Sequence, residues 1–528
     1  MANRYWVTGG TGDWNSTTNW STSSGGASGA SVPGSSDTAT LDASSGAGSV
    51  TLDISPDIQT LTCTGFTGTL VFGTNTISLN STGTIFTGAT TMTVTGTPLI
   101  ICTNSSATAR TILPGTGITE ANSISFRVTA GTGTFTVSTT PTVRDLDFTD
   151  GVNPTGFAGS LTMAIVTIFG NFKASTGMTC PTSGNTTTFA ATSGTKTINT
   201  AGVTFDRPFT FNGVGGTWQL QAALTSGATR TVTLTNGTLD LNGYTFTIGL
   251  FSSTNSNVRT LAFGSTGEFV LTATSGGIWT TSISTNLTVT GTNPLIQATA
   301  GGAGTRTITM GAAGETNAIS VDVTSGSDIV TFATTGGAFK NVNFTGFTGT
   351  SNIQNSIAVF GNWNYGGTTT QGVGTGTVTF SATSGTKTIT SNGFSFPGNV
   401  AFNGVGGAWE CQDALSVTGT LTMTNGTLQL KSGVTSTVGA FATSGTNAKY
   451  LFSTTFGTAA TISDASGTNT VQYLTVQDSI ATGGAIFDAL AITNVDAGNN
   501  TGWLFSTTPS IGNEITMRLR SFTQPRRF

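Results

Sequence analysis

The sequence contains no histidine and few charged residues. Only 8% of its 528 residues are Asp, Glu, Lys or Arg, and the formal net charge is −4. The absence of histidine excludes the histidine-based catalytic triads, and with unclustered cysteines it leaves no ligand set for a zinc centre. The sparse positive charge provides no general basic surface for nucleic acid. We therefore expect no metal and no nucleic-acid partner.

The four cysteines are spread along the chain and form no CxxC pair. They are Cys63, Cys102, Cys180 and Cys411. In a repeated segment described below, Cys411 takes the place that Leu220 has in the other copy. A cysteine that replaces leucine is typical of a small apolar core residue. The pattern therefore favours free, buried thiols over a disulfide or a metal site.

Long apolar segments and cofactor motifs are also missing. No apolar run approaches the roughly 20 residues that span a bilayer, so we expect no membrane insertion. The start, MANRYWVTGGTGDW, has no apolar core of a secretory signal, and export by the general secretory route is not expected. The sequence has no GxxxxGK[ST] loop, and isolated GxG patterns carry no weight in a glycine-rich chain. We expect no cofactor.

The residues that are abundant favour β-structure. The chain has 73 glycines and 33 phenylalanines, and 36% of its residues are apolar. Low charge together with steady apolar content argues against disorder. Threonine and valine are β-branched residues that favour strands, whereas glycine and asparagine favour turns. The composition predicts an all-β protein.

Segments of the sequence recur in the same order about 191 positions apart. FNGVGGTWQL at Phe211–Leu220 is followed by FNGVGGAWEC at Phe402–Cys411, and TSGTKTI occurs at Thr192–Ile198 and Thr383–Ile389. An ordered set of matches of this length indicates an internal duplication. We predict five regions: an N-terminal cap or attachment segment at 1–50, lead-in coils at 51–92, a first copy at 93–287, a second copy at 288–475, and a C-terminal cap with a basic tail at 476–528.

Short alternating segments within each copy predict the architecture. Pieces of five to eight residues, such as GTFTVST and RTVTLTN, alternate apolar and polar residues between Gly, Asn and Ser. They fit a parallel β-solenoid, or β-helix, in which successive coils stack their apolar residues inside. They also fit an array of β-sandwich domains. The lack of proline-rich linkers favours the solenoid, whose open ends would need caps.

The N-terminal region is rich in aromatic residues. Tyr5, Trp6, Trp14 and Trp20 lie in the first 20 positions. Such a group could bind a sugar, or it could form a hydrophobic plug over the first coil. We favour the plug.

The two ends of the chain resemble a class of bacteriophage proteins. The opening pattern YWV.GG.GDWN…NWS…VP…D.A.LD and the ending NVDAGNNTGWLF at Asn494–Phe505 are similar to those of virion appendage proteins, namely tail-fibre and head-fibre-like β-solenoids of the marine-phage type. A related opening occurs in bacterial surface β-helix proteins. The resemblance implies a virion location after assembly in the host cytoplasm, other virion proteins as partners, and a homotrimer. It brings no catalytic motif.

The C-terminal segment MRLRSFTQPRRF concentrates positive charge. It contains Arg518, Arg520, Arg526 and Arg527. These arginines could dock onto an acidic neighbour in an assembly, or the segment could be a solvated, mobile end.

One segment, RDLDFTD, has the acids that a glycan-cleaving enzyme needs. Asp145 and Asp147 alternate along a predicted strand and should share a face, as the paired carboxylates of such enzymes do. The second copy has Asn341 and Asn343 in their places. The fold therefore does not need these acids. We favour a structural interpretation, an exposed strand with Asp–Arg pairing or an Asx turn, and predict no catalytic residue.

Two aromatic residues are the candidates for ligand binding. Trp363 and Tyr365 in GNWNY replace Phe172 and Ala174 of the first copy, and their alternation puts both rings on one side of a strand. The rings could stack on a sugar, or they could belong to the core or to an interface.

These observations together predict a protein without enzymatic activity. We expect a structural or adhesive virion protein, a fibre or spike that projects from the tail or capsid and contacts host surface glycans. The alternatives are a capsid decoration protein, a polysaccharide-degrading tailspike, and a bacterial surface β-helix adhesin. The adhesin would require a signal peptide and a C-terminal anchor.

Overall fold

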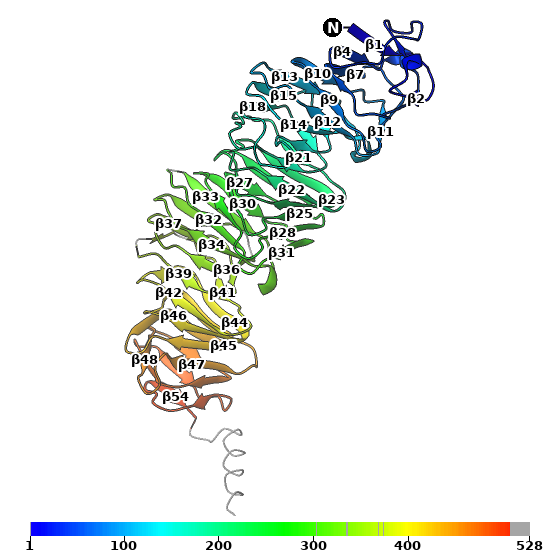
Figure 1. The fold of residues 1–528 in the computed structure, drawn as a ribbon. Coiled ribbons are helices and arrows are strands. Elements are labelled where there is room, and N and C mark those ends of the chain that lie inside the picture. Colours follow the sequence, from blue (N-terminus) through cyan, green and yellow to red (C-terminus); the bar gives the residue numbers. More distant parts are fainter. Residues whose placement is uncertain (1, 303, 334–335, 368, 373, 507–528) are drawn as a thin grey trace, which may run out of the picture. The chain divides into compact units, whose positions relative to one another are not determined.

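The computed structural model describes residues 2–302, 304–333, 336–367, 369–372 and 374–506, and it forms two compact units. Unit 1 comprises Met1–Val270 and Thr285–Thr292, and unit 2 comprises Leu271–Ser284 and Asn293–Phe528, each within the described ranges. Both units consist of short strands joined by turns (Figure 1). The helices in the described residues are four single 3-10 turns, η1 (Thr17–Asn19), η2 (Ala43–Ser45), η3 (Glu120–Asn122) and η4 (Glu315–Asn317).

Unit 1 is a parallel β-solenoid in which each turn pairs with the next. Ala39 pairs with Leu61, 22 positions later, and Leu61 pairs with Phe86, a further 25 positions along the chain. The first turns have three faces. One face carries β4 (Asp37–Thr40), β7 (Thr60–Thr62), β10 (Gly83–Thr87), β13 (Arg110–Leu113), β15 (Thr134–Val137) and β18 (Ser160–Met163). The second face carries β2 (Gly12–Asp13), β5 (Ser49–Thr51), β8 (Thr69–Val71) and β11 (Thr93–Thr95).

The third face of unit 1 carries the candidate site. It begins with β6 (Asp57–Ile58), β9 (Ile77–Leu79), β12 (Leu99–Cys102) and β14 (Ser125–Val128). It continues through β17 (Leu146–Asp147), β20 (Phe172–Lys173), β22 (Thr195–Asn199), β23 (Phe209–Leu220), β25 (Thr231–Asp240), β28 (Arg259–Ala262) and β31 (Leu287–Thr290). Beside them run β16 (Thr142–Val143), β19 (Val166–Ile168), β21 (Thr187–Phe189) and β27 (Leu250–Ser252), while β24 (Leu224–Thr225) pairs with β26 (Thr245–Ile248).

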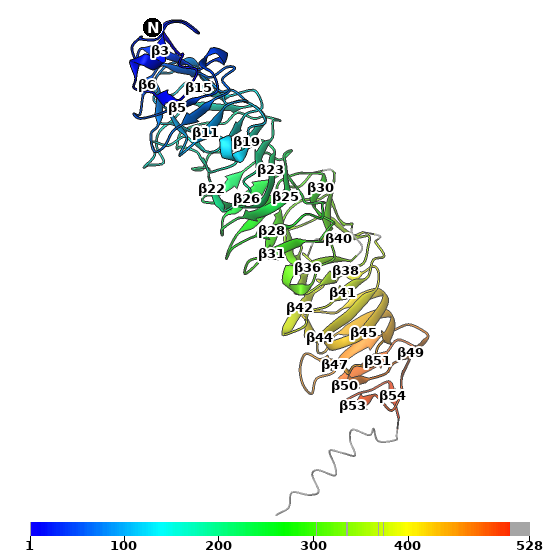
Figure 2. The same ribbon diagram turned by 90° about the vertical axis from the view of Figure 1, so that its right-hand side faces the viewer.

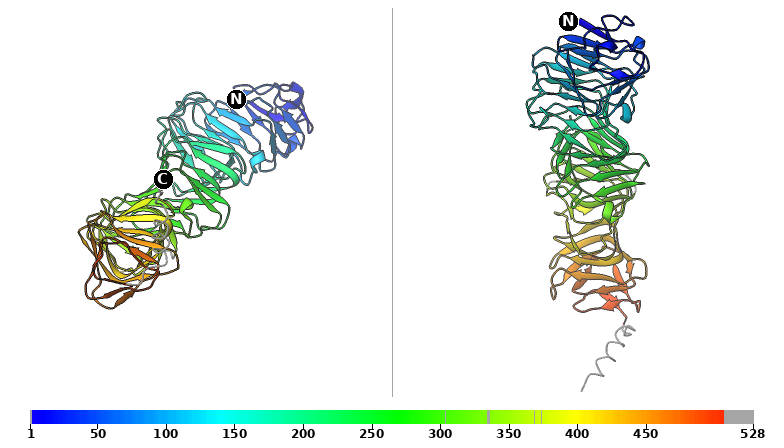
Figure 3. Two further views of the ribbon diagram at one scale, coloured as in Figure 1. Left: turned by 90° about the horizontal axis from the view of Figure 1, so that it is seen from below. Right: turned by 45° about the vertical axis from the view of Figure 1, so that its right-hand side comes forward.

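Unit 2 repeats this parallel stacking (Figures 2 and 3). One series is β30 (Gly276–Thr281), β33 (Thr305–Met310), β35 (Ile329–Phe332), β37 (Thr350–Ile353) and β40 (Thr370–Gln371). A longer series is β32 (Leu295–Ala298), β34 (Ile319–Val323), β36 (Gly337–Asn343), β38 (Ile357–Val359), β39 (Trp363–Asn364), β41 (Val378–Phe380), β42 (Thr386–Thr390), β43 (Ser395–Phe396), β44 (Val400–Cys411) and β45 (Ser416–Leu430).

The last turns of unit 2 again carry three series of strands. They contain β46 (Thr435–Thr443), β47 (Lys449–Ser453), β48 (Ala460–Ser463), β50 (Leu474–Val476), β51 (Ser479–Thr482) and β53 (Val495–Asp496), with a three-stranded sheet of β49 (Thr468–Thr470), β52 (Ile486–Ala489) and β54 (Trp503–Phe505). The predicted all-β, parallel solenoid is therefore confirmed for each unit. The alternative of β-sandwich domains is wrong, because consecutive strands pair in parallel with the next turn and not as hairpins.

Stacked apolar side chains fill the inside of each turn. Leu61, Phe86, Ile112 and Val137 follow one another in register on four successive strands, and all are fully buried. A single turn could not bury these groups alone, so each turn depends on its neighbours for stability.

The tryptophans of the N-terminal region close the first turn. Trp6, Trp14 and Trp20 are 1%, 0% and 0% exposed, and the Trp14 and Trp20 rings meet edge to face with centroids 4.8 Å apart. Trp20 lies on β3 (Trp20–Ser21), which pairs antiparallel with β1 (Ala2–Trp6) at the end of the first face. An antiparallel strand at this place covers an otherwise open sheet edge. The plug interpretation is confirmed, and the buried rings present no face to a sugar.

Close backbone contacts explain why the FNGVGG segment occurs twice. Both β23 and β44 bulge within this segment, where the register against the next strand shifts. A Cβ on Gly213 would overlap the carbonyl oxygen of Ala191 and approach the Trp218 ring. In the second copy Gly404 is confined in the same way by the Ala382 carbonyl. The buried tryptophan and the bulge over it therefore require glycine at this place in each copy.

Alanine at either glycine should therefore destabilise its unit. We expect Gly213→Ala and Gly404→Ala each to lower the free energy of unfolding by about 1–3 kcal/mol, the usual effect of overpacking. Gly184→Ala is the control, because a Cβ there meets nothing within 4 Å. Urea titration of the purified variants measures the differences. Equal midpoints for Gly184→Ala and Gly213→Ala would contradict this explanation of the motif.

All four cysteines are free thiols. Cys63, Cys102 and Cys411 are buried, and Cys180 is half-buried. Cys411 and its counterpart Leu220 are 1% and 0% exposed, which confirms the small apolar core residue predicted there. Burial raises the pKa of Cys63 and of Cys102 to about 12 and also raises the pKa of Cys411.

These environments predict selective alkylation. The thiolate is the reactive form, and burial suppresses both its formation and reagent access. At pH 8 we expect iodoacetamide to modify Cys180 slowly in the folded protein and to leave the other three cysteines intact. All four should react in urea. Peptide mass spectrometry measures the sites, and rapid labelling of Cys63 or Cys411 in the folded protein would contradict their burial.

Candidate functional site

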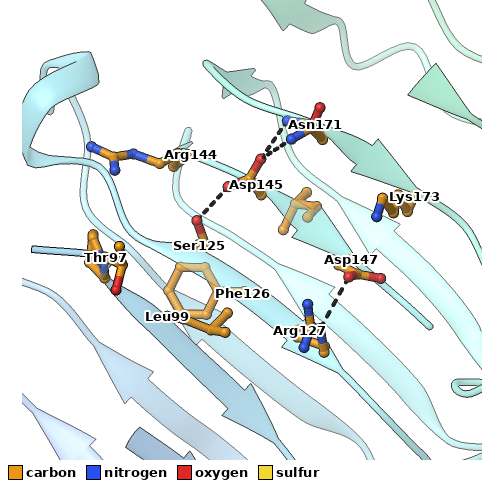
Figure 4. A pocket seen from close by; sticks show the side chains of 12 residues that line it. Thr97, Leu99, Ser125, Phe126, Arg127, Arg144, Asp145, Asp147, Asn171 and Lys173 are labelled. Atoms are coloured by element: carbon orange, nitrogen blue, oxygen red, sulfur yellow. Dashed lines mark hydrogen bonds and ion pairs between the residues drawn. The ribbon is translucent and has the colours of Figure 1, made fainter. Parts of the chain in front are cut away.

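A polar groove crosses the third face of unit 1 and contains both predicted acids. It encloses about 350 Å³, and its walls come from β12, β14, β17 and β20 (Figure 4). Asp145 and Asp147 both line it, so the prediction that they share a face is confirmed. The other polar lining residues are Thr97, Ser125, Arg127, Arg144, Asn171 and Lys173.

One row of side chains, the ladder column, links four successive turns along this groove. It consists of Ser125, Asp145, Asn171 and Thr197. The Ser125 hydroxyl donates to Asp145 Oδ2 at 2.5 Å, and Asp145 Oδ1 accepts from the Asn171 backbone N–H and side-chain amide at 2.6 and 2.9 Å. Asn171 Oδ1 in turn accepts from the Thr197 N–H and hydroxyl at 2.9 and 3.0 Å. Asp145 is therefore an acceptor that joins turns.

Unit 2 has an equivalent groove of about 370 Å³ with the same ladder column. Its members are Ser320, Asn341, Asn362 and Thr388. Asn341 donates to the Ser320 hydroxyl at 3.0 Å, the Asn362 N–H donates to Asn341 Oδ1 at 2.8 Å, and the Thr388 N–H donates to Asn362 Oδ1 at 2.9 Å. An amide oxygen thus replaces the carboxylate oxygen of Asp145. The ladder needs an acceptor at this position and does not need a charge.

The second column lies two residues further along each strand. In unit 1 it holds Arg127, Asp147 and Lys173, which are in register on β14, β17 and β20. Asp147 Oδ2 is 3.1 Å from Arg127 Nε, and Asp147 Oδ1 accepts from the N–H and hydroxyl of Thr149 at 3.0 and 2.6 Å. The predicted Asp–Arg pair and Asx turn are therefore confirmed. The expected exposure is wrong, because Asp147 is only 8% exposed at the foot of the groove.

The second column of unit 2 keeps the turn but contains no cation. It holds Asp322, Asn343 and Asn364 in register. Asn343 Oδ1 accepts from the N–H and hydroxyl of Thr345 at 3.1 and 2.7 Å, as Asp147 does from Thr149. The conserved part of both columns is the hydrogen bonding that holds turns and corners in place.

A glutamate beside each groove ties distant turns together. Glu120 on η3 accepts from the Thr192 N–H and hydroxyl at 3.0 and 2.6 Å, across 72 positions of sequence. Glu315 on η4 accepts from Thr383 in the same way at 3.1 and 2.7 Å. Each glutamate belongs to a further repeated segment, TEANSIS at Thr119–Ser125 and GETNAIS at Gly314–Ser320. The contact explains why this segment recurs together with TSGTKTI. In unit 1 it borders a second hollow of about 790 Å³, which shares Arg144 with the groove.

The third acid of the RDLDFTD segment lies outside both hollows. Asp150 is exposed and accepts hydrogen bonds from the backbone N–H groups of Val152 and Asn153. The bonds from Asn153, followed by the bond from Val152, lower the pKa of the Asp150 carboxyl. Its position indicates a turn-forming residue.

The two aromatic ligand-binding candidates are core residues. Trp363 and Tyr365 do share one side of the chain, but that side faces inward, and both are 0% exposed. The Trp363 ring packs against Tyr365 and Phe396 with centroids 5.2 and 5.5 Å away. Sugar stacking requires an open ring face, so the expectation of a sugar-binding pair is corrected.

Three further predictions concern the basic C-terminal segment, metal binding and membrane insertion. Arg518, Arg520, Arg526 and Arg527, the predicted docking residues, lie outside the described residues. Within the described ranges, no three Cys, Asp or Glu side chains gather closely enough to hold a metal ion. No helix in those ranges is long and apolar enough to cross a membrane.

The grooves have no signal in any one stretch of the sequence. Ser125 ends the TEANSIS segment and Arg144 begins RDLDFTD, but no motif joins them to Asn171 and Lys173. The four residues come together only because strands 20 to 26 positions apart are neighbours. The signal that could have revealed them is the recurrence of Ser, Asn and Thr at matched places in the two copies.

Comparison of the chain with family models, curated proteins and solved structures finds no match in any of the three. The function is therefore inferred from the chain's own residues.

Proposed function

We propose that this chain is a structural and adhesive protein of a bacteriophage virion, without enzymatic activity. In this proposal it forms a fibre or spike on the tail or capsid and contacts host surface glycans. The observation that carries the proposal is the duplicated groove. Most of its polar side chains serve to join one turn to the next, and the same joints occur in both units.

The stacked turns suit a mechanical role. The backbone groups of each turn pair with neighbouring turns, and the inside is filled mainly by apolar residues, with a few buried arginines among them. Such a structure resists local opening, because a turn can leave the stack only by breaking bonds on two sides. Duplication of the unit adds further turns without requiring a new fold.

The virion location rests on the resemblance of the two ends to phage appendage proteins. The same resemblance supports other virion proteins as partners and a homotrimer. The arginines at 518, 520, 526 and 527 are the proposed contacts to an acidic neighbour. A capsid decoration protein is the variant of this proposal in which many copies cover the head.

A polysaccharide-degrading tailspike is the second candidate function. Asp145 and Asp147 share a groove, as the acids of such an enzyme must. Against this candidate, each oxygen of Asp145 already accepts a hydrogen bond from an adjoining turn, and Asp147 is held by Arg127 and Thr149. The second copy also lacks both acids.

The position of the chain on virus particles tests the proposal. Quantitative mass spectrometry of purified particles gives the copy number, and antibody labelling in the electron microscope gives the place. A few labelled sites on the tail would support a fibre, and hundreds of copies over the head would support a decoration protein. Absence from particles would overturn the virion proposal and favour a bacterial surface adhesin.

A further inference from the structure

Four cations follow the groove of unit 1 across successive turns. Arg127 is on β14, Arg144 precedes β17, Lys173 is on β20 and Lys196 is on β22. All four line the groove or the hollow that adjoins it. With strands about 4.8 Å apart, this row extends over roughly 14 Å. A row of this length matches a chain-like ligand better than a single small ion.

Three of these cations have no carboxylate partner in the described residues. Arg144 donates only to the carbonyl oxygens of Glu120 and Ala121, at 3.3 and 3.2 Å. The side-chain ammonium groups of Lys173 and Lys196 take part in no hydrogen bond or ion pair within the described ranges. Figure 4 shows Arg144 and Lys173 at the two sides of the groove. The positive charge in the groove therefore exceeds the charge that its own acids neutralise.

The second copy keeps only two of these four cations. Lys340 and Lys387 match Arg144 and Lys196, whereas Asp322 stands in the place of Arg127 and Asn364 stands in the place of Lys173. The ladder column and the threonine turn are unchanged between the two grooves. Charge therefore differs at two kinds of position. Asn replaces the acids Asp145 and Asp147 and keeps their hydrogen bonds, whereas the replacements at Arg127 and Lys173 remove positive charge from the groove.

We propose that the groove of unit 1 binds an acidic saccharide chain, one that carries carboxylate or sulfate groups, and that the groove of unit 2 does not. Arg127, Arg144, Lys173 and Lys196 would contact the anionic groups. The uncharged polar side chains that line the groove, such as Thr97 and Asn171, would face the sugar hydroxyls. The inference rests on the proposed adhesive function and names the ligand class of this site.

A reciprocal exchange between the two copies tests the inference. Oligogalacturonate supplies carboxylates, a heparin oligosaccharide supplies sulfates, and methyl-esterified oligogalacturonate is the neutral control. Calorimetric titration of the purified full chain measures the affinity for each. Lys173→Asn gives unit 1 the residue that unit 2 has at the same place, so the fold should be preserved. We expect it to weaken acidic-saccharide binding roughly tenfold, the effect of one charged hydrogen bond.

A second pair of variants provides the matched control. Lys196 and Lys387 occupy the same position of the TSGTKTI segment in the two copies. Lys196→Gln should weaken binding, whereas Lys387→Gln should leave it unchanged. Asn364→Lys should add affinity to unit 2. Binding of one acidic probe and not the other would identify carboxylate or sulfate as the recognised group.

Three results would overturn the inference. They are no binding of either acidic probe, equal affinity for the methyl ester, and equal effects of Lys196→Gln and Lys387→Gln. These results are independent of the particle experiment. If the chain is present on virions but binds neither acidic saccharide, the proposed structural role stands and the proposed saccharide site does not. If the chain binds an acidic saccharide but is absent from virions, the saccharide site stands and the virion location does not.

Discussion

Replacing Asp328 with asparagine should lower the free energy of unfolding of unit 2 by about 3–5 kcal/mol, because it leaves a buried arginine without its counter-charge. Asp328 Oδ2 and Oδ1 lie 2.7 and 2.8 Å from Arg306 Nε and Nη2, and both side chains are 0% exposed. The guanidinium also lies over the Phe347 ring, 5.7 Å from its centroid. Water cannot reach this site to compensate for the lost partner.

The control for this variant is Asp206→Asn in unit 1. Asp206 pairs with Arg230 at 2.8 Å, but the two side chains are 27% and 20% exposed. A partly solvated pair contributes at most about 1 kcal/mol. Urea unfolding of both variants, followed by tryptophan fluorescence, gives the comparison. If Asp328→Asn cost no more than Asp206→Asn, the buried pair would not hold unit 2 together as described.

The first copy shows that this acid is not required by the fold itself. Arg110, the counterpart of Arg306, is also fully buried, but it donates to the carbonyl oxygens of Asn104 and Ala130 at 2.7 and 2.8 Å. Burial lowers the pKa of the Arg110 guanidinium. Gly133 stands where Asp328 would be, and a Cβ there would overlap the Ala107 carbonyl. The two copies thus provide different hydrogen-bond acceptors for the buried arginine at this place, a carboxylate for Arg306 and backbone carbonyls for Arg110.

Trp363→Ala should cost about 3–5 kcal/mol, the usual effect of emptying a large core position. The indole is 0% exposed and contacts the Tyr365 ring on its own turn and the Phe396 ring on the next. Removing it leaves a cavity at the level where the ladder column crosses from Asn341 to Asn362. The loss should appear as a lower midpoint of urea unfolding for unit 2.

Two further variants make the Trp363 result specific. Trp363→Phe restores the ring that the first copy has at Phe172, so it should cost less than Trp363→Ala. Phe456→Ala removes a side chain that is 85% exposed and should change stability by less than about 0.5 kcal/mol. A Trp363→Ala protein of normal stability that no longer binds saccharide would restore the sugar-stacking interpretation.

The sequence was sufficient to predict the structural features that depend on a local residue pattern or on the internal repeat. Alternating Thr and Val with Gly between them fits strands and turns in almost any β-fold. The ordered recurrence of FNGVGG and TSGTKTI then indicated stacking. Three tryptophans in a short polar segment predicted the hydrophobic plug over the first coil.

The sequence was insufficient where the answer depends on which turns are neighbours. Alternation predicted that Trp363 and Tyr365 share a side, but it could not say that this side faces inward. Asp145 gave the same difficulty, because its role depends on Ser125 and Asn171 in adjoining turns. Residues 20 to 26 positions apart in turns of unequal length have no fixed spacing to reveal the ladder.

We propose that the chain holds host glycans without cutting them. The most direct test incubates the purified chain with polysaccharide isolated from the host surface and measures both retained protein and released reducing ends. We predict retention with no release over time. A steady release of reducing ends that disappears in Asp145→Asn and Asp147→Asn proteins would contradict the account and identify the groove as the centre of a glycan-cleaving enzyme.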